Sequence, residues 1–181
     1  MAAGLLQNLL SSWFSKPDHQ REIYDWIREH APVVKIVEIG LGNAKRAQEL
    51  IEFSQKHSGG QRIEFLGIDM YEARTTGDGI PLKTAHKTLN ATGAKVQLVP
   101  GDGAMALPRV ANAFRGVQLM IISADQDADS LRQGLSWIPR MLTEESVVLW
   151  EITDGKGNLS FRAYSQAEIE AMVPAPMRRA A

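Results

Sequence analysis

Two glycines separated by one residue follow a short apolar run, in the stretch EIGLGNA at 38–44. Glycines at a strand-to-helix junction allow a tight turn, and they let a ligand approach the backbone at the first turn of the helix. The spacing therefore predicts a ligand site at Gly40 and Gly42, next to the carboxylate of Glu38. A tight connection that binds no ligand is the alternative that these residues leave open.

Two aspartates follow later apolar runs at the same kind of place. Asp69 belongs to the stretch GIDM at 67–70, and Asp102 lies between two glycines in PGDGA at 100–104. A carboxylate at the first place can accept both hydroxyls of a ribose. A carboxylate at the second can accept from an exocyclic amine such as that of adenine. The alternatives are an aspartate that caps a loop at Asp69 and a helix N-cap at Asp102, where both roles can hold together.

The third glycine of a dinucleotide-binding turn is missing. In the pattern G-x-G-x-x-G that begins at Gly40, this chain has Lys45 at the last position. A glycine there permits close packing of the helix on the strand, which a long side chain prevents. The residues therefore disfavour NAD binding, and an NAD-dependent oxidoreductase stays a weaker alternative.

A sheet must position these residues, and the hydropathy pattern predicts one. Short apolar runs rich in β-branched residues are typical of strands buried on both faces, at 33–39, 63–69, 95–99, 117–123 and 146–152. Helical patterns with one apolar face separate the runs, at 43–56, 80–91, 107–114 and 131–138. This alternation predicts a Rossmann-like α/β fold, a doubly wound and mostly parallel sheet with helices on both faces. Ligands in such sheets bind at the carboxyl ends of the strands, where the turns described above lie.

The order of the three stretches, EIGLG, GIDM and PGDGAMALP, resembles the class I S-adenosylmethionine (SAM)-dependent methyltransferase family. The resemblance covers residues 33–152. Its fourth run ends in MIISAD at 120–125, which is similar to the strand that ends beside the transferred methyl group in this family. The resemblance implies a sheet order of about 3-2-1-4-5, and it implies SAM as the cofactor.

The resemblance also implies a role for each residue that matches the family's motifs. Glu38, Gly40 and Gly42 would line the methionine half of the cofactor. Asp69 would accept the ribose hydroxyls, and Met70 would pack on the adenine. These roles would place the first two strand ends of the sheet directly against SAM.

At the adenine end, Asp102 would receive the exocyclic amine, with Gly103 supplying a backbone N–H. Asp125 is the expected polar group nearest the methyl, and Tyr71 is a second candidate. Methyl transfer from a sulfonium is an in-line displacement on an activated donor, so the protein mainly aligns the acceptor with the methyl and excludes water. A general base is needed only if the acceptor must lose a proton.

The acidic run DQDAD at 125–129 also admits a metal site, because some methyltransferases of this family bind a divalent cation at the end of strand four. Those proteins use an Asp-Asn pair after strand five, where this chain offers Glu151 and Asp154 without the asparagine. Carboxylates also favour the positive end of a helix dipole. We therefore expect the run to begin a helix and expect no metal. The histidines are scattered and expected at the surface, at His19, His30, His57 and His86.

The C-terminal part departs from the family, whose sheet normally continues with two further strands. Here LSFRAYS at 159–165 predicts one strand and AEIEAMV at 167–173 predicts one helix, so the C-terminal strands are shortened. The substrate site of the family borrows from that half, so the acceptor is unknown. The sequence predicts a SAM-dependent methyltransferase. A non-catalytic SAM-binding or scaffold module with the same fold is the alternative.

Residues 1–32 are expected to form N-terminal helices packed on a single SAM-binding domain at 33–181. An apolar stripe at helical spacing favours packing on the domain or on a twin subunit, and so a possible homodimer. A membrane-surface helix would need basic flanks, which this segment lacks. The stripe consists of Leu5, Leu6, Leu9, Leu10, Trp13 and Phe14.

The composition excludes several classes of protein. Lys and Arg number 20 against 21 Asp and Glu in 181 residues, a net charge of −1, which argues against a strongly basic nucleic-acid binder. The absence of cysteine excludes disulfides, thiolate metal sites and cysteine nucleophiles. No basic residue precedes Lys16, and no apolar run is long enough to span a membrane. We therefore expect a cytoplasmic protein with a small-molecule acceptor.

Overall fold

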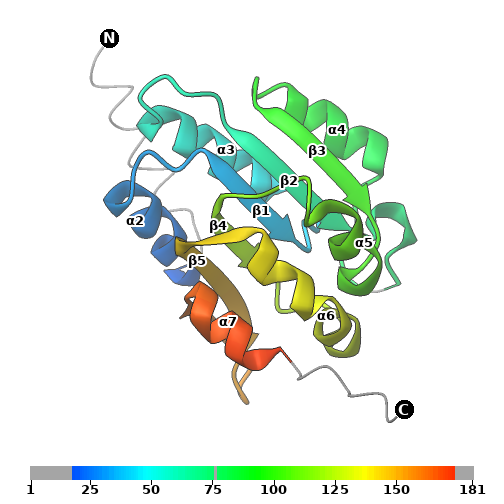
Figure 1. The fold of residues 1–181 in the computed structure, drawn as a ribbon. Helices are drawn as coiled ribbons and strands as arrows, with labels where there is room; N and C mark the ends of the chain where they lie inside the picture. Colours follow the sequence, from blue (N-terminus) through cyan, green and yellow to red (C-terminus); the bar gives the residue numbers. More distant parts are fainter. Residues whose placement is uncertain (1–17, 76, 174–181) are drawn as a thin grey trace.

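The computed structural model describes residues 18–75 and 77–173 of the chain. These residues form one six-stranded sheet in the order β3-β2-β1-β4-β5-β6 (Figure 1). The strands are β1 (Lys35–Ile39), β2 (Glu64–Asp69), β3 (Lys95–Pro100), β4 (Val117–Ile122), β5 (Leu142–Thr153) and β6 (Leu159–Tyr164). Neighbouring strands from β3 to β5 pair in parallel, and β6 pairs with β5 antiparallel. The predicted sheet order and doubly wound class are confirmed.

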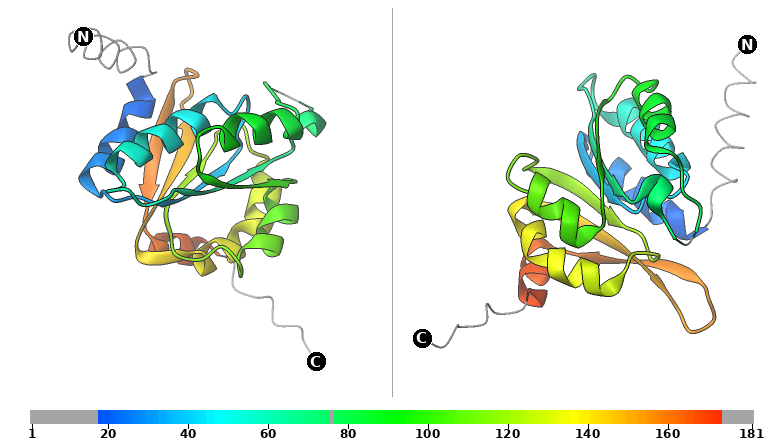
Figure 2. Two further views of the ribbon diagram at one scale, coloured as in Figure 1. Left: turned by 90° about the horizontal axis from the view of Figure 1, so that it is seen from above. Right: turned by 90° about the vertical axis from the view of Figure 1, so that its right-hand side faces the viewer.

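Helices connect the strands and cover both faces of the sheet, as Figure 2 shows. The α-helices are α2 (Arg21–Glu29), α3 (Lys45–His57), α4 (Leu82–Asn90), α5 (Gly103–Val110), α6 (Ala128–Gly134) and α7 (Gln166–Met172). Short 3₁₀ helices are η1 (Asp18–Gln20), η2 (Tyr71–Ala73) and η3 (Leu135–Arg140). Alternate residues of each strand point to opposite faces, so the sheet separates two apolar cores. Helices α2, α3 and α4 cover one core, and α5, α6 and α7 cover the other.

The element boundaries differ from the sequence pattern at three places. Strand β5 begins at Leu142, four positions before the predicted apolar run, because Leu142 already pairs with Val117 of β4, ahead of a shift in register. Helix α5 begins at Gly103, where Asp102 caps it, ahead of its most apolar face. The last crossover helix continues as η3 beyond Gly134, and η3 contains Pro139, which has no N–H for an α-helical bond.

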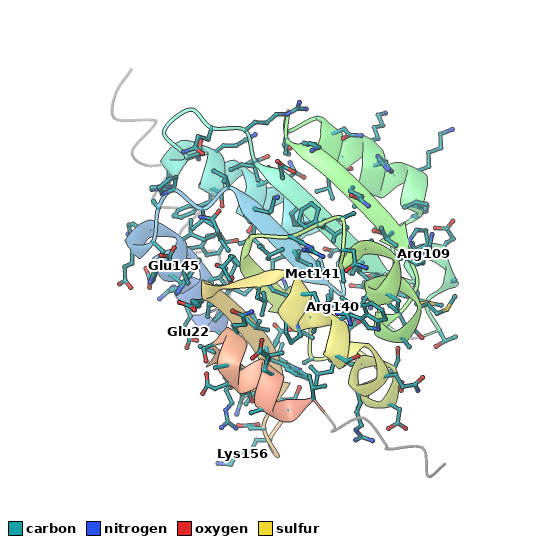
Figure 3. The ribbon with its side chains drawn as sticks, in the orientation of Figure 1. Glu22, Arg109, Arg140, Met141, Glu145 and Lys156 are labelled. Carbon is teal, nitrogen blue, oxygen red and sulfur yellow. The ribbon has the colours of Figure 1, made fainter. Side chains whose placement is uncertain are left out.

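The C-terminal part adds one antiparallel strand and one helix, as the sequence predicts. The turn between β5 and β6 contains Lys156, which Figure 3 labels. Strand β6 is the last in the sheet order, so its outer edge has no neighbouring strand within the described ranges 18–75 and 77–173. No helix among the same residues is long and apolar enough to cross a membrane. The apolar stripe predicted at residues 1–15 lies outside the described residues.

Helices α5 and α6 pack closely at two glycines. A Cβ atom built on Gly134 would lie 2.4 Å from the carbonyl oxygen of Gly103 and 2.7 Å from Leu107 Cδ1. A Cβ atom on Gly103 would lie 3.2 Å from the Cα of Leu131. Backbone atoms of the two helices are therefore nearly in contact, and this contact fixes α5 beside the carboxyl end of β3.

We expect Gly134→Ala to lower the free energy of unfolding by about 2 kcal/mol, because the added methyl group forces the two backbones apart. Gly155→Ala is the matched control, since a Cβ at that position has no heavy atom within 4 Å. Its effect should stay within about 0.5 kcal/mol, as for most surface positions. Urea unfolding of both variants measures the difference. Equal losses of stability would contradict the close helix contact.

Candidate functional site

A cavity of about 190 Å³ lies beyond the carboxyl ends of β2, β3 and β4. The structure brings together four of the residues singled out from the sequence, namely Asp69, Met70, Asp102 and Asp125. The residues that line the cavity are Asp69, Met70, Ala73, Arg74, Thr75, Asp102, Asp125, Gln126 and Asp127. Parallel pairing explains this gathering, because the carboxyl ends of parallel strands meet at one edge of the sheet.

The glycine turn after β1 needs its unusual backbone. Gly40 has φ of +90° and Gly42 has φ of +57°, a left-handed region that glycine enters without strain. Ala44 also has a positive φ of 61°. A Cβ on Gly40 would lie 2.4 Å from Gln126 Nε2, so the amide of Gln126 lies directly against the turn. Lys45, which stands at the position of the third glycine, is exposed at the start of α3, so the argument against NAD stays a prediction.

Asp69 is the most fully bonded side chain of the cavity. Its carboxylate accepts from the backbone N–H of Gly42 at 3.0 Å and of Tyr71 at 2.9 Å. Arg74 donates from Nε to Oδ1 and from Nη2 to Oδ2, both at 2.6 Å. Burial alone would raise the pKa of Asp69, but the bonds from Arg74, Tyr71 and Gly42 outweigh it and hold the pKa below its ordinary value. The ribose role of Asp69 therefore stays a prediction, at a carboxylate that already has a partner.

The adenine end predicted from the sequence lies between β3 and α5. Asp102 caps α5, because its Oδ1 accepts from the backbone N–H of Met105 at 2.9 Å. Within the described part of the chain, Oδ2 of Asp102 has no hydrogen bond and is available to a ligand. Met70 is 38% exposed, so its side chain offers an apolar surface at the cavity. Gly103 is buried against α6, and its backbone N–H begins α5.

The acidic run after β4 joins the cavity to the start of α6. Asp127 caps α6 by accepting from the N–H of Ser130 at 2.7 Å, which confirms the helix-cap interpretation. Asp125 accepts from Arg74 Nη1 at 2.6 Å and from Gln126 Nε2 at 2.8 Å. Over residues 18–75 and 77–173, no group of three His, Asp or Glu side chains is arranged to hold a metal ion.

A buried ion cluster lies on the α3 side of the sheet, next to the glycine turn. Arg46 donates to Glu38 Oε1 at 2.7 Å, to Glu151 Oε1 at 3.1 Å and to Ser123 Oγ at 2.6 Å. The Glu38 side chain is fully buried, and its Oε2 has no partner among the described residues. His19 Nε2 lies 3.2 Å from Glu151 Oε1. Burial raises the pKa of Glu38, although the charge of Arg46 works against this.

Sequence reasoning missed Arg46, Arg74 and His19. A signal for Arg46 exists, because it lies four residues before Leu50 and so on the apolar face of α3. His19 was expected at the surface, but its side chain is only 17% exposed, and it stacks on Phe161. Tyr71, the second candidate near the methyl group, stays a prediction. Its side chain is buried, and its hydroxyl donates to the carbonyl of Gly67 at 3.1 Å.

The comparisons with known proteins give a fold and no close relative. No protein-family model and no curated protein matches the chain. Among solved structures, CalS11, a TDP-rhamnose 3′-O-methyltransferase of calicheamicin biosynthesis, is similar with a TM-score of 0.59 and 18% identity, over 78% of this chain and 68% of that one. A TehB-like SAM-dependent methyltransferase from Corynebacterium glutamicum is similar with a TM-score of 0.53 and 14% identity, over 95% of this chain and 78% of that one.

The methyltransferase CalH, solved with S-adenosylhomocysteine (SAH), is similar with a TM-score of 0.53 and 14% identity. That match covers 74% of this chain but only 36% of CalH. At these identities the likeness shows the fold alone. The chain has the fold of the class I SAM-dependent methyltransferases, with a Rossmann-like sheet.

Two carboxylate oxygens without a hydrogen bond among the described residues suit a cofactor that brings donor groups. They are Oδ2 of Asp102, at the cavity, and Oε2 of Glu38, which is buried two residues before the glycine turn. Asp69 also has the right chemistry, but its oxygens are taken by Arg74. The cavity of about 190 Å³ is also smaller than the roughly 300 Å³ at which small-molecule pockets begin.

We expect Glu38→Gln to change how stability depends on pH. Because the folded protein raises the pKa of Glu38 above its ordinary 4.5, it holds this proton more tightly than the unfolded chain does. The contribution of Glu38 to stability is therefore full below pH 4.5 and is lost as pH rises through the raised pKa. From pH 5 to pH 8, the parent should therefore lose more stability than the variant, which has no carboxyl group to titrate at position 38.

Urea unfolding at several pH values measures this difference directly. Arg46→Met tests the other side of the cluster, since it leaves two buried carboxylates without their cation. We expect that variant to lose about 3–5 kcal/mol at pH 7. Parallel pH curves for the parent and Glu38→Gln would show that burial does not disfavour the charged form of Glu38.

Proposed function

We propose that this protein binds SAM at the carboxyl ends of β1 to β4 and transfers its methyl group to a small-molecule acceptor. The observation that supports this most strongly is the composition of one cavity. Asp69, Met70, Asp102 and Asp125 come from three different strand ends and line it together. The glycine turn lies beside them, because Gln126 lines the cavity and also contacts Gly40.

Each group of the cofactor has a residue of suitable chemistry in this arrangement. Asp102 would accept the adenine amine through Oδ2 while Oδ1 keeps capping α5, and Met70 would cover the adenine face. Asp69 would accept the ribose hydroxyls, and Glu38 with the glycine turn would line the methionine half. When bound, SAM supplies an activated methyl group on a sulfonium.

The chain itself then needs to orient the acceptor and keep water away, more than to supply an acid or a base. Asp125 is the polar side chain proposed nearest the methyl group. It is 48% exposed, so an acceptor can approach it from solvent. Its bonds to Arg74 and Gln126 fix the carboxylate at the mouth of the cavity.

A binding isotherm for SAH beside one for NAD tests the proposal. We expect SAH to bind and NAD to give no heat of binding, because Lys45 stands where a dinucleotide-binding turn has the third glycine that permits close packing of the helix on the strand. Asp102→Asn should weaken SAH binding roughly 10- to 100-fold, since a charge-assisted bond is lost. Asparagine still caps a helix well, so folding should survive.

Asp129→Asn is the matched control, because Asp129 is not among the residues that line the cavity and pairs with the exposed Arg132 at 3.0 Å. This variant should bind SAH like the parent. Binding of NAD without binding of SAH would overturn the proposed function in favour of an oxidoreductase.

A non-catalytic SAM-binding module is the second candidate. The small cavity and the single strand after β5 favour it, because both reduce the room for an acceptor. Turnover with a panel of small hydroxyl, amine and acid acceptors separates the two. An enzyme should form methylated product and SAH with at least one acceptor, whereas a binding module should bind SAH and form neither.

A further inference from the structure

Four side chains form a continuous polar chain across the mouth of the cavity, which we name the cross-cleft chain: Asp69, Arg74, Asp125 and Gln126. Arg74 bonds Asp69 with two N–H groups and Asp125 with a third, all at 2.6 Å. Asp125 then accepts from Gln126 Nε2 at 2.8 Å. The same amide nitrogen lies against Gly40, so the cross-cleft chain connects the end of β2 to the glycine turn after β1.

The carboxylate of Asp69 has no acceptor capacity left in this arrangement. An ionised carboxylate offers about four lone-pair sites. The N–H groups of Gly42 and Tyr71 use two of them, and Arg74 uses the other two, one on each oxygen. A ribose diol would also place one donor on each oxygen. Arg74 therefore occupies the same acceptor sites that two ribose hydroxyls would use.

We infer that Arg74 is a built-in competitor for the ribose site, which must leave Asp69 before an adenosyl ligand can bind. The inference rests on the proposed function, since it concerns the ribose of the same cofactor. In the free protein the cross-cleft chain keeps the site closed and the buried carboxylate paired. Ligand binding exchanges two guanidinium donors for two hydroxyl donors, so the number of hydrogen bonds to Asp69 is unchanged.

Only the side chain of Arg74 has to move for this exchange. The backbone at the end of β2 is fixed separately, because Tyr71 donates its N–H to Asp69 and its buried hydroxyl to Gly67. Asp69 therefore keeps its two backbone bonds when the guanidinium leaves. The outer partner of Arg74 is half-exposed Asp125, so the guanidinium can move toward solvent while it stays near that carboxylate, and the ribose hydroxyls then bond to the buried Asp69.

A closed free state lowers the apparent affinity for the ligand. The apparent dissociation constant is the intrinsic one divided by the fraction of molecules that are open. Removing Arg74 removes the closed state, and the ribose hydroxyls then satisfy Asp69 without competition. The cavity should also become larger at the point where the ribose would lie, since Arg74 is part of its lining.

The test compares calorimetric binding of SAH and of adenine to the parent, Arg74→Met, Asp125→Asn and Arg132→Met. Methionine keeps most of the arginine stem and removes the donors. We expect Arg74→Met to bind SAH roughly 10-fold or more tightly than the parent, and to bind adenine, which has no ribose, with unchanged affinity. Arg132→Met, the control at an exposed ion pair with Asp129, should leave SAH binding unchanged.

Asp125→Asn removes only the outer anchor of Arg74, and it should tighten SAH binding by less than Arg74→Met does. If circular dichroism shows that Arg74→Met fails to fold, the SAH affinity of Asp125→Asn tests the inference instead. Equal or weaker SAH binding by Arg74→Met would overturn the inference and leave the proposed function standing. Adenine tightening as much as SAH would overturn the ribose assignment. Absence of SAH binding in every protein would overturn both proposals.

Discussion

Four acidic side chains lie at the carboxyl edge of this sheet, and two arginines neutralise them. Arg46 pairs with Glu38 and Glu151, and Arg74 pairs with Asp69 and Asp125. Ionised carboxylates in a partly buried place are costly unless a cation and further hydrogen bonds accompany them. The two pairings connect α3, the loop after β2 and the loop after β4 to this edge of the sheet.

Periodicity and turn chemistry predicted the frame of the site. Apolar runs and helical patterns depend on local sequence, so they predicted a mostly parallel sheet and the residues that follow each strand. Asp69 and Asp102 could be identified because each stands at a strand end, and Asp102 also lies between two glycines. The resemblance to a methyltransferase motif then gave these positions specific roles, which remain predictions.

The arginine pairings could not be predicted in the same way. Arg46 meets Glu151 across 105 positions of sequence, and Arg74 meets Asp125 across 51. No periodicity connects such residues, and an arginine after a strand looks like any solvated loop residue. Helix η2 leads to Arg74, and its first residue, Tyr71, has a left-handed backbone with φ of 52°, an unusual conformation for a bulky residue. Sequence patterns alone therefore predict where the carboxylates lie, but not which arginines pair with them.

The two arginines differ in a way that separates stability from ligand binding. Both partners of Arg46 are buried, at 0% and 7% side-chain exposure, so moving it would leave two carboxylates inside the protein without a cation. Arg74 has one buried partner and one that is 48% exposed. Its buried partner also keeps two backbone N–H bonds of its own. Moving Arg74 therefore leaves one buried carboxylate that keeps two backbone bonds, whereas moving Arg46 leaves two buried carboxylates. The edge of the sheet thus combines one buried ion cluster next to the glycine turn with one pair, Arg74 and Asp69, that we propose is exchangeable.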